Sequence, residues 1–176
     1  MLFRSIQAVG GAAKLATVTC ITGKGTYHGY DDFETFPFDI YGKAPNQKTT
    51  ILHSQYGDTT MVYDGRAGWI ASPTEVKPEP VMTLTGGNLE GARVEAELLF
   101  PARIKQTLGN WVVGPLTGIG DRAVRIVQGK KASGSPIKLY FEQESGLLVR
   151  VVRYADSPVG RVPTQVDYSD YRDVSG

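Results

Sequence analysis

The chain has 176 residues, of which 41% are hydrophobic and 21% are charged, so a folded domain with a real core is expected rather than a disordered segment. Nineteen basic and eighteen acidic residues leave a net charge of +1, which excludes the strongly basic surface typical of nucleic-acid or anionic-membrane binding. Apolar runs of only a few residues predict a soluble chain with no membrane-spanning segment.

The N-terminal part of the chain predicts one short amphipathic helix from Ile6 to Ala16, because its apolar residues recur at nearly helical spacing. Gly10 and Gly11 lie inside this stretch, at an expected cost of about 1 kcal/mol each against alanine. Paired glycines of this kind also permit close packing, here expected against a sheet.

From residue 17 to residue 71 the apolar residues alternate with polar ones, which is typical of half-buried strands. The clearest case places Phe36, Phe38 and Ile40 on one face of one strand. Pro37 cannot donate a ladder hydrogen bond, so this strand is expected to be an edge strand or to be bulged.

Further strands are predicted over residues 48–55 and 58–63, and Asp64-Gly65 is a tight hairpin signal before another strand at 67–70. Together these elements predict an antiparallel meander.

A proline-containing loop is expected over residues 72–80, followed by a helix from Asn88 to Leu99 and a short helix starting at Pro101. Strand resumes at Trp111. The remaining strands are expected over 122–128, 136–142, 147–154 and 160–172, with a polar loop over 130–135. The order of helix, meander, helical insert and second meander predicts an α+β fold in which the sheet dominates.

The sequence contains no recognisable metal or catalytic motif. Cys20 is the only cysteine and is expected to be a buried thiol, while His28 is expected in a loop and His53 on a strand face. No His-x-x-x-His, Cys-x-x-Cys or Gly-x-Ser-x-Gly pattern occurs, so neither a metal ion nor another cofactor is predicted.

Two weaker sequence patterns are also better explained without a catalytic or binding role. The carboxylate pairs Asp31/Asp32 and Asp167/Asp170 are expected to be solvated. Residues 85–88, Thr-Gly-Gly-Asn, could present backbone N–H groups to a phosphate, but they lack the lysine of a P-loop, and a flexible helix entry is the simpler interpretation.

Aromatic residues on the alternating strands leave two interpretations open. They either fill a solid core, or they line a cavity left between a curved sheet and its helices, which could take an acyl chain.

Several motifs resemble the LolA-like family of outer-membrane lipoprotein-sorting proteins. They are the opening residues 8–15 with the strand over 18–27, the Tyr-Asp-Gly-Arg-Ala-Gly-Trp motif at 63–69, the hairpin motifs at 138–142 and 145–150, and the ending over 160–172. The resemblance covers nearly the whole chain.

The resemblance implies a LolA-like incomplete antiparallel β-barrel, a curved sheet wrapped around two or three short helices. It also implies a periplasmic location and the ability to shield an acyl chain. Some relatives carry this domain behind a c-type or reaction-centre cytochrome segment, although no Cys-x-x-Cys-His haem motif occurs here. We expect residues 1–176 to form a single domain that is truncated at both ends.

The leading functional hypothesis is therefore a non-catalytic periplasmic module that binds a lipid or the acyl chain of a lipoprotein. The predicted lining residues are Phe36, Phe38, Ile40, Leu52, Trp69, Trp111, Leu139 and Phe141. The alternative is a structural or interaction domain of a larger envelope protein or cytochrome-containing redox protein. An enzyme ranks third, because it would need a titratable cluster that only folding could assemble.

Overall fold

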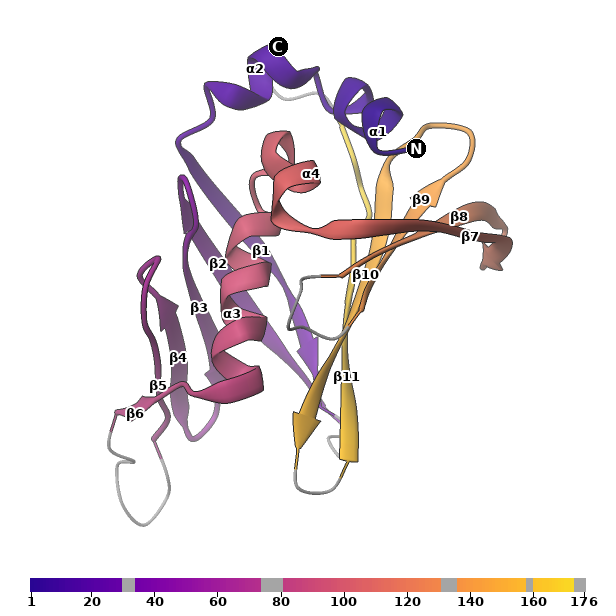
Figure 1. Ribbon diagram of the computed structural model, residues 1–176. Coiled ribbons are helices and arrows are strands. Elements are labelled where there is room, and N and C mark those ends of the chain that lie inside the picture. Colours follow the sequence, from indigo (N-terminus) through magenta and orange to yellow (C-terminus); the bar gives the residue numbers. More distant parts are fainter. Residues whose placement is uncertain (30–33, 74–80, 131–135, 158–159, 173–176) are drawn as a thin grey trace. The chain divides into compact units, whose positions relative to one another are not determined.

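The computed structural model describes residues 1–29, 34–73, 81–130, 136–157 and 160–172. It is an α+β fold, as the sequence predicts, and it has two antiparallel sheets and a few short helices (Figure 1). The chain divides into two compact units, one made of Met1–Leu15 with Ala102–Gly176 and the other of Ala16–Pro101. Most of the loops expected at 72–80 and 130–135, namely residues 74–80 and 131–135, lie outside the described residues, as do Asp31 and Asp32.

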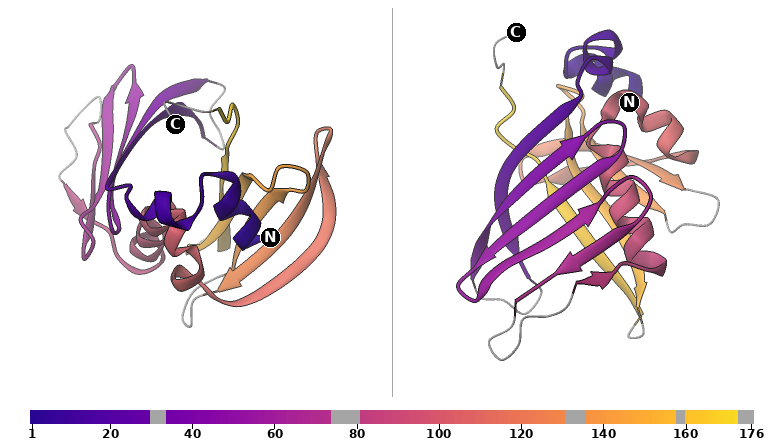
Figure 2. Two further views of the ribbon diagram at one scale, coloured as in Figure 1. Left: turned by 90° about the horizontal axis from the view of Figure 1, so that it is seen from above. Right: turned by 90° about the vertical axis from the view of Figure 1, so that its left-hand side faces the viewer.

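The unit of residues 16–101 is built on a six-stranded sheet whose strands follow one another in chain order. Its strands are β1 (Cys20–His28), β2 (Thr35–Lys43), β3 (Gln47–Ser54), β4 (Gly57–Tyr63), β5 (Gly68–Ala71) and β6 (Met82–Thr83). The right-hand view of Figure 2 shows these strands side by side. The predicted first meander is confirmed, and from β2 to β5 it forms because short turns return each strand directly to its neighbour.

The turn between β4 and β5 shows how the sequence sets this meander. The Asp64 carboxylate accepts hydrogen bonds from the backbone N–H groups of Arg66 and Ala67, both at 2.8 Å. These two bonds lower the pKa of Asp64, because they stabilise its charged form. Gly65 takes a φ of +100°, which a glycine adopts without steric cost.

The strand that contains Pro37, β2, is neither an edge strand nor bulged at this residue, contrary to expectation. β2 lies between β1 and β3, and the β1–β2 register runs without a shift through Thr26 opposite Pro37. On the other side, the ladder with β3 begins only at Phe38, opposite Leu52. The missing N–H of Pro37 therefore falls just beyond the end of that ladder, where no donor is needed.

The helix α3 (Gly86–Leu98) packs on β3 and β4. It begins two residues earlier than predicted, after Thr85 in an extended conformation. The core beneath it contains Tyr63, Leu84, Ala92 and Ala96, with Met61, Ile70 and Leu89 packed around them.

In the other unit, the predicted N-terminal helix is broken into α1 (Leu2–Ala8) and α2 (Ala12–Ala16). Gly10 and Gly11 take φ values of +105° and +86°, which end α1 in place of continuing it. The Gly11 N–H donates to the carbonyl of Ile6 at 2.8 Å, so the glycine pair closes the helix end as a cap. The prediction of one continuous helix was wrong, because it weighed only the propensity cost of the glycines.

The same unit continues with a 3₁₀ turn (Pro101–Arg103), α4 (Ile104–Thr107) and a five-stranded sheet. Its strands are β7 (Gly109–Ile119), β8 (Arg122–Lys130), β9 (Ile137–Glu142), β10 (Leu148–Ser157) and β11 (Gly160–Asp167). They again neighbour one another in chain order, with β7 and β11 at the two edges. The second predicted meander is therefore confirmed.

The sequence resemblance predicts one curved sheet, whereas the strand pairing gives two separate sheets. Among the described residues neither sheet closes on itself, because the first and last strands of each are not paired with one another. The expectation of a single domain over 1–176 stays a prediction. In the described part of the chain, every helix is too short or too polar to cross a membrane.

Candidate functional site

An apolar strip lies on one face of the sheet β1–β6, and its position follows from strand register. Phe36, Phe38 and Ile40 alternate along β2 on one face, and Leu52 of β3 is paired directly with Phe38. Tyr27 of β1 is paired with Phe36, and its ring centroid lies 6.4 Å from that of Phe38. We call these five residues the apolar strip.

The strip lies on the same face as α3 but beyond the strands on which that helix packs. Ile40 is in register with Thr50 and, through it, with Met61 beside the α3 core, so both share one face. α3 packs mainly on β3 and β4, whereas the strip is centred on β2. Phe38 and Ile40 are half-buried, and 43% of Tyr27 is exposed.

Two glycines of β1 leave room beside the strip. Gly23 is paired with Ile40 and Gly25 with Phe38, so a side chain at either position would point toward the strip face. Among the described residues, a Cβ atom built on Gly25 meets no atom within 4 Å outside its neighbours in the chain. Gly25 therefore borders open space next to the Phe38 ring, where an apolar group could lie.

A charged pair lies on the same face, at the α3 side of the strip. The Lys48 ammonium of β3 donates to a carboxylate oxygen of Glu95 on α3 at 2.6 Å, and only 10% and 15% of the two side chains are exposed. This pair ties the helix to the sheet.

Trp69 lies on the opposite face of the sheet from the other predicted residues of this unit. It is paired with Val62, whereas its neighbour Ile70 is paired with Met61 on the α3 face. Successive side chains of a strand alternate between faces, so Trp69 does not share a surface with Phe38. Sequence alternation alone did not relate the faces of separate strands.

The other three predicted lining residues belong to the second unit. Leu139 and Phe141 alternate with polar residues on β9 and are completely buried. A Cβ atom on Gly129 would lie only 2.7 Å from the Trp111 ring and 2.9 Å from Leu108, so Trp111 packs closely over this glycine. Because Leu139 and Phe141 are completely buried, they match the interpretation that the aromatic and aliphatic residues fill a core. Half-buried Phe38 and Ile40 match that interpretation less closely.

A polar cluster occupies the face of the sheet opposite the strip. His53 of β3 lies between two carboxylates, with Nδ1 at 2.9 Å from Asp58 of β4 and Nε2 at 3.3 Å from Asp39 of β2. Hydrogen bonds to Asp58, and secondarily to Asp39, raise the pKa of His53 above its ordinary value. The sequence placed His53 on a strand, but only the register brings the three side chains together.

The structure also places Cys20, His28 and the pair Asp167 and Asp170, for which expectations follow from the sequence. Cys20 is exposed at the start of edge strand β1, not buried as expected, and His28 ends β1 instead of lying in a loop. Asp167 accepts a hydrogen bond from Arg150 at 3.0 Å, and Asp170 lies 3.6 Å from Arg172.

Residues 85–88, considered above as a phosphate site, form the entry of α3 in the structure. Within the described residues, no three His, Cys, Asp or Glu side chains are grouped so as to hold a metal ion.

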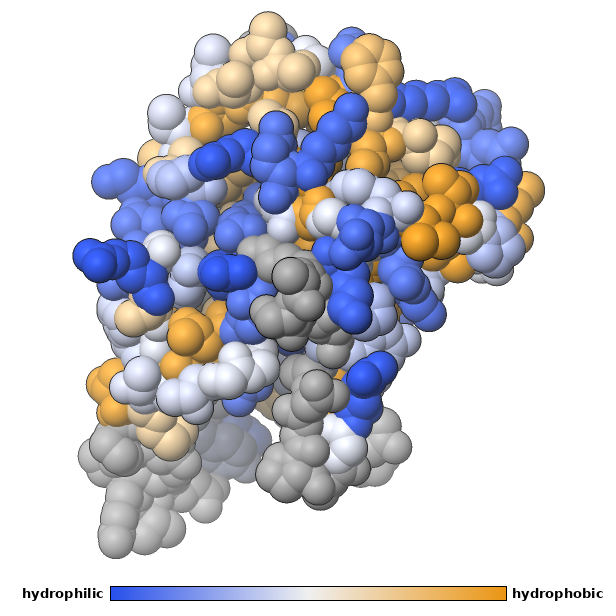
Figure 3. All heavy atoms as spheres, in the orientation of Figure 1, coloured by the Kyte–Doolittle hydropathy of each residue, from blue (hydrophilic) through white to orange (hydrophobic). Residues whose placement is uncertain are grey.

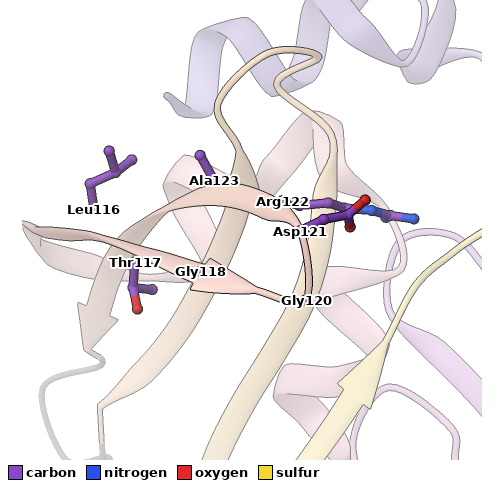
Figure 4. A pocket seen from close by; sticks show the side chains of 7 residues that line it. All are labelled: Leu116, Thr117, Gly118, Gly120, Asp121, Arg122 and Ala123. Carbon is purple, nitrogen blue, oxygen red and sulfur yellow. The ribbon is translucent and has the colours of Figure 1, made fainter.

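A hollow of about 320 Å³ lies at the tip of the β7–β8 hairpin. Its lining consists of Leu116, Thr117, Gly118, Gly120, Asp121, Arg122 and Ala123. Figure 4 shows that these side chains point in several directions and do not converge on the hollow. It therefore offers no set of groups that could hold a ligand in one orientation.

Comparison with solved structures shows that the chain is similar to a protein of known structure but unassigned function. A DUF1329 family protein from Desulfovibrio piger ATCC 29098 superimposes with a TM-score of 0.47 at 12% identity, over 86% of this chain and 72% of that chain. No family model and no curated protein matches the sequence.

Proposed function

We propose that the chain is a non-catalytic binding module that takes up an apolar ligand, either a lipid or the acyl chain of a lipoprotein, along the apolar strip. The observation that carries the proposal is the combination of half-buried Phe38 and Ile40 with open space at Gly25. Aromatic and aliphatic side chains beside unfilled space form a surface that loses water favourably when an acyl chain covers it.

The energetics of such binding need no covalent step. Each methylene removed from water contributes about 0.8 kcal/mol, so a chain of about twelve carbons contributes on the order of 10 kcal/mol before the costs of association. The resemblance of several sequence motifs to LolA-like proteins supports the same proposal, and we propose a periplasmic location on the same ground.

A second candidate function is a structural or interaction domain within a larger envelope or cytochrome-containing redox protein. It is favoured by edge strand β7, where Val112, Val113 and Leu116 are 57%, 68% and 47% exposed. Figure 3 shows hydrophobic atoms gathered at the surface over β7. Exposed apolar side chains grouped on one strand are typical of a surface that another protein covers.

Native mass spectrometry after incubation with bacterial lipid extract tests the binding proposal. The wild-type protein is expected to retain a lipid-sized adduct, and Phe38→Ala is expected to reduce it at least several-fold because the ring borders the open space. Trp69→Ala is the matched control, since it removes an aromatic ring from the opposite face of the same sheet. A bare wild-type mass, or an equal loss in both variants, would contradict the proposal and favour the interaction domain.

Filling the space at Gly25 gives a complementary prediction. Gly25→Leu is expected to abolish the lipid adduct while the thermal midpoint stays unchanged or rises, because a Cβ atom at this position has room among the described residues and glycine in a strand costs about 0.5–1 kcal/mol. Thr26→Leu is the control, since it adds a similar side chain to the other face of β1. Undiminished lipid retention in Gly25→Leu would place the ligand elsewhere.

A further inference from the structure

The strongest unexplained feature is the bridge that His53 forms across three strands. Both ring nitrogens of His53 face a carboxylate oxygen, Asp58 on β4 at 2.9 Å and Asp39 on β2 at 3.3 Å. Asp58 is also the register partner of His53. The exposed fractions of the three side chains are 37% for His53, 56% for Asp58 and 18% for Asp39.

The protonation state of His53 follows from this geometry. A neutral imidazole carries one N–H and one lone pair, and only the imidazolium ion donates from both nitrogens. With the neutral ring, one nitrogen lone pair would face a carboxylate oxygen and no hydrogen bond would form there. The arrangement therefore fits the cation, and a cation with both N–H groups engaged cannot serve as a general base.

Other charged and polar groups also face this cluster. From β1, the Lys24 ammonium lies 4.0 Å from the other oxygen of Asp39, and His28 occupies the same face near the strand end. From β2, the Tyr41 hydroxyl donates to Asp39 at 3.4 Å. The two carboxylates that contact His53 directly outweigh the more distant Lys24, which is 89% exposed and screened by solvent.

We infer that His53 is a protonation-dependent clamp, which in its charged form joins β2, β3 and β4 on the face opposite the apolar strip. The clamp alternates with the strip along the same strands: Asp39 lies between Phe38 and Ile40, and His53 follows Leu52. Loss of the proton on His53 removes one of the two hydrogen bonds and the attraction to both carboxylates, so that the backbone ladders hold β2, β3 and β4 without the clamp.

Proton NMR of the two histidine rings tests the charge assignment directly. We expect His53 to titrate above about 6.5, the value of an unperturbed histidine. Asp58→Asn is expected to lower this midpoint more than Asp39→Asn, in the order of their hydrogen-bond contributions. His28→Gln identifies the resonances and serves as the control. A His53 midpoint at or below 6.5 would overturn the inference.

The stability of the protein supplies a second readout. A histidine whose pKa is raised on folding stabilises the folded state below its unfolded pKa, and this contribution disappears as pH rises through the folded pKa. The wild-type protein is therefore expected to have a higher thermal midpoint than His53→Gln near pH 5, with the difference shrinking toward about pH 9. A difference that is constant with pH would contradict the clamp.

A third readout connects the clamp to ligand retention, and this step rests on the proposed function. Lipid retention by the wild-type protein is expected to fall as pH rises through the His53 midpoint, whereas that of His53→Gln changes little. The same pH dependence in both proteins would overturn the coupling. Lipid retention absent at every pH, with the NMR shift present, would instead remove the binding proposal and leave the clamp standing.

Discussion

Replacing Phe141 with alanine is expected to lower the free energy of unfolding by about 3–5 kcal/mol, the range for removing a fully buried phenylalanine. The Phe141 side chain has an exposed fraction of 0%, as does Leu139 two residues before it. Urea denaturation followed by tryptophan fluorescence measures this loss. Val113→Ala is the control, because Val113 is 68% exposed on β7 and its truncation is expected to change stability by less than about 0.5 kcal/mol.

The outcome at Phe141 also separates the two interpretations of the aromatic strands. A core residue loses stability on truncation, whereas a residue that lines a cavity loses ligand with a smaller change in stability. A loss below about 1 kcal/mol together with a lost lipid adduct would show that Phe141 lines a cavity. Phe38 and Ile40 of the apolar strip, which are half-buried, are expected to follow the second pattern.

Lys48→Met is expected to destabilise the unit of residues 16–101 by about 2–3 kcal/mol. The substitution keeps an unbranched apolar stem but leaves the Glu95 carboxylate, 15% exposed, without the ammonium that lies 2.6 Å away. Breaking a fully buried pair typically costs about 3–5 kcal/mol, and the residual solvent access here reduces that figure.

The double variant Lys48→Met/Glu95→Leu completes the test of this pair. Removing both charges is expected to recover much of the loss, because an apolar pair can pack between β3 and α3 without a desolvation cost. Arg172→Ala is the control, since its partner Asp170 and Arg172 itself are 76% and 74% exposed. Equal losses in Lys48→Met and Arg172→Ala would mean that burial of the Lys48–Glu95 pair contributes nothing.

Much of the fold could be predicted from local patterns in the sequence. Alternation placed Phe36, Phe38 and Ile40 on one face of one strand, and the structure has them there. Asp64-Gly65 predicted the β4–β5 hairpin, where the Asp64 carboxylate caps the turn. Both meanders could be predicted because each strand pairs with its neighbour in the chain. Where the described residues join two strands, as from β2 to β5, the pairing follows from turns a few residues long.

The sequence by itself therefore determined the α+β class, the two meanders and which side chains share a face within one strand, since these depend on contacts between near neighbours. Relations between strands were decided only by tertiary structure. Register placed Trp69 on the face opposite Phe38, joined His53 to Asp39 and Asp58, and left open space at Gly25. An alternating sequence pattern shows that successive side chains lie on opposite faces of a strand. Only the pairing of strands decides which of their side chains share a face and which face is packed against a helix.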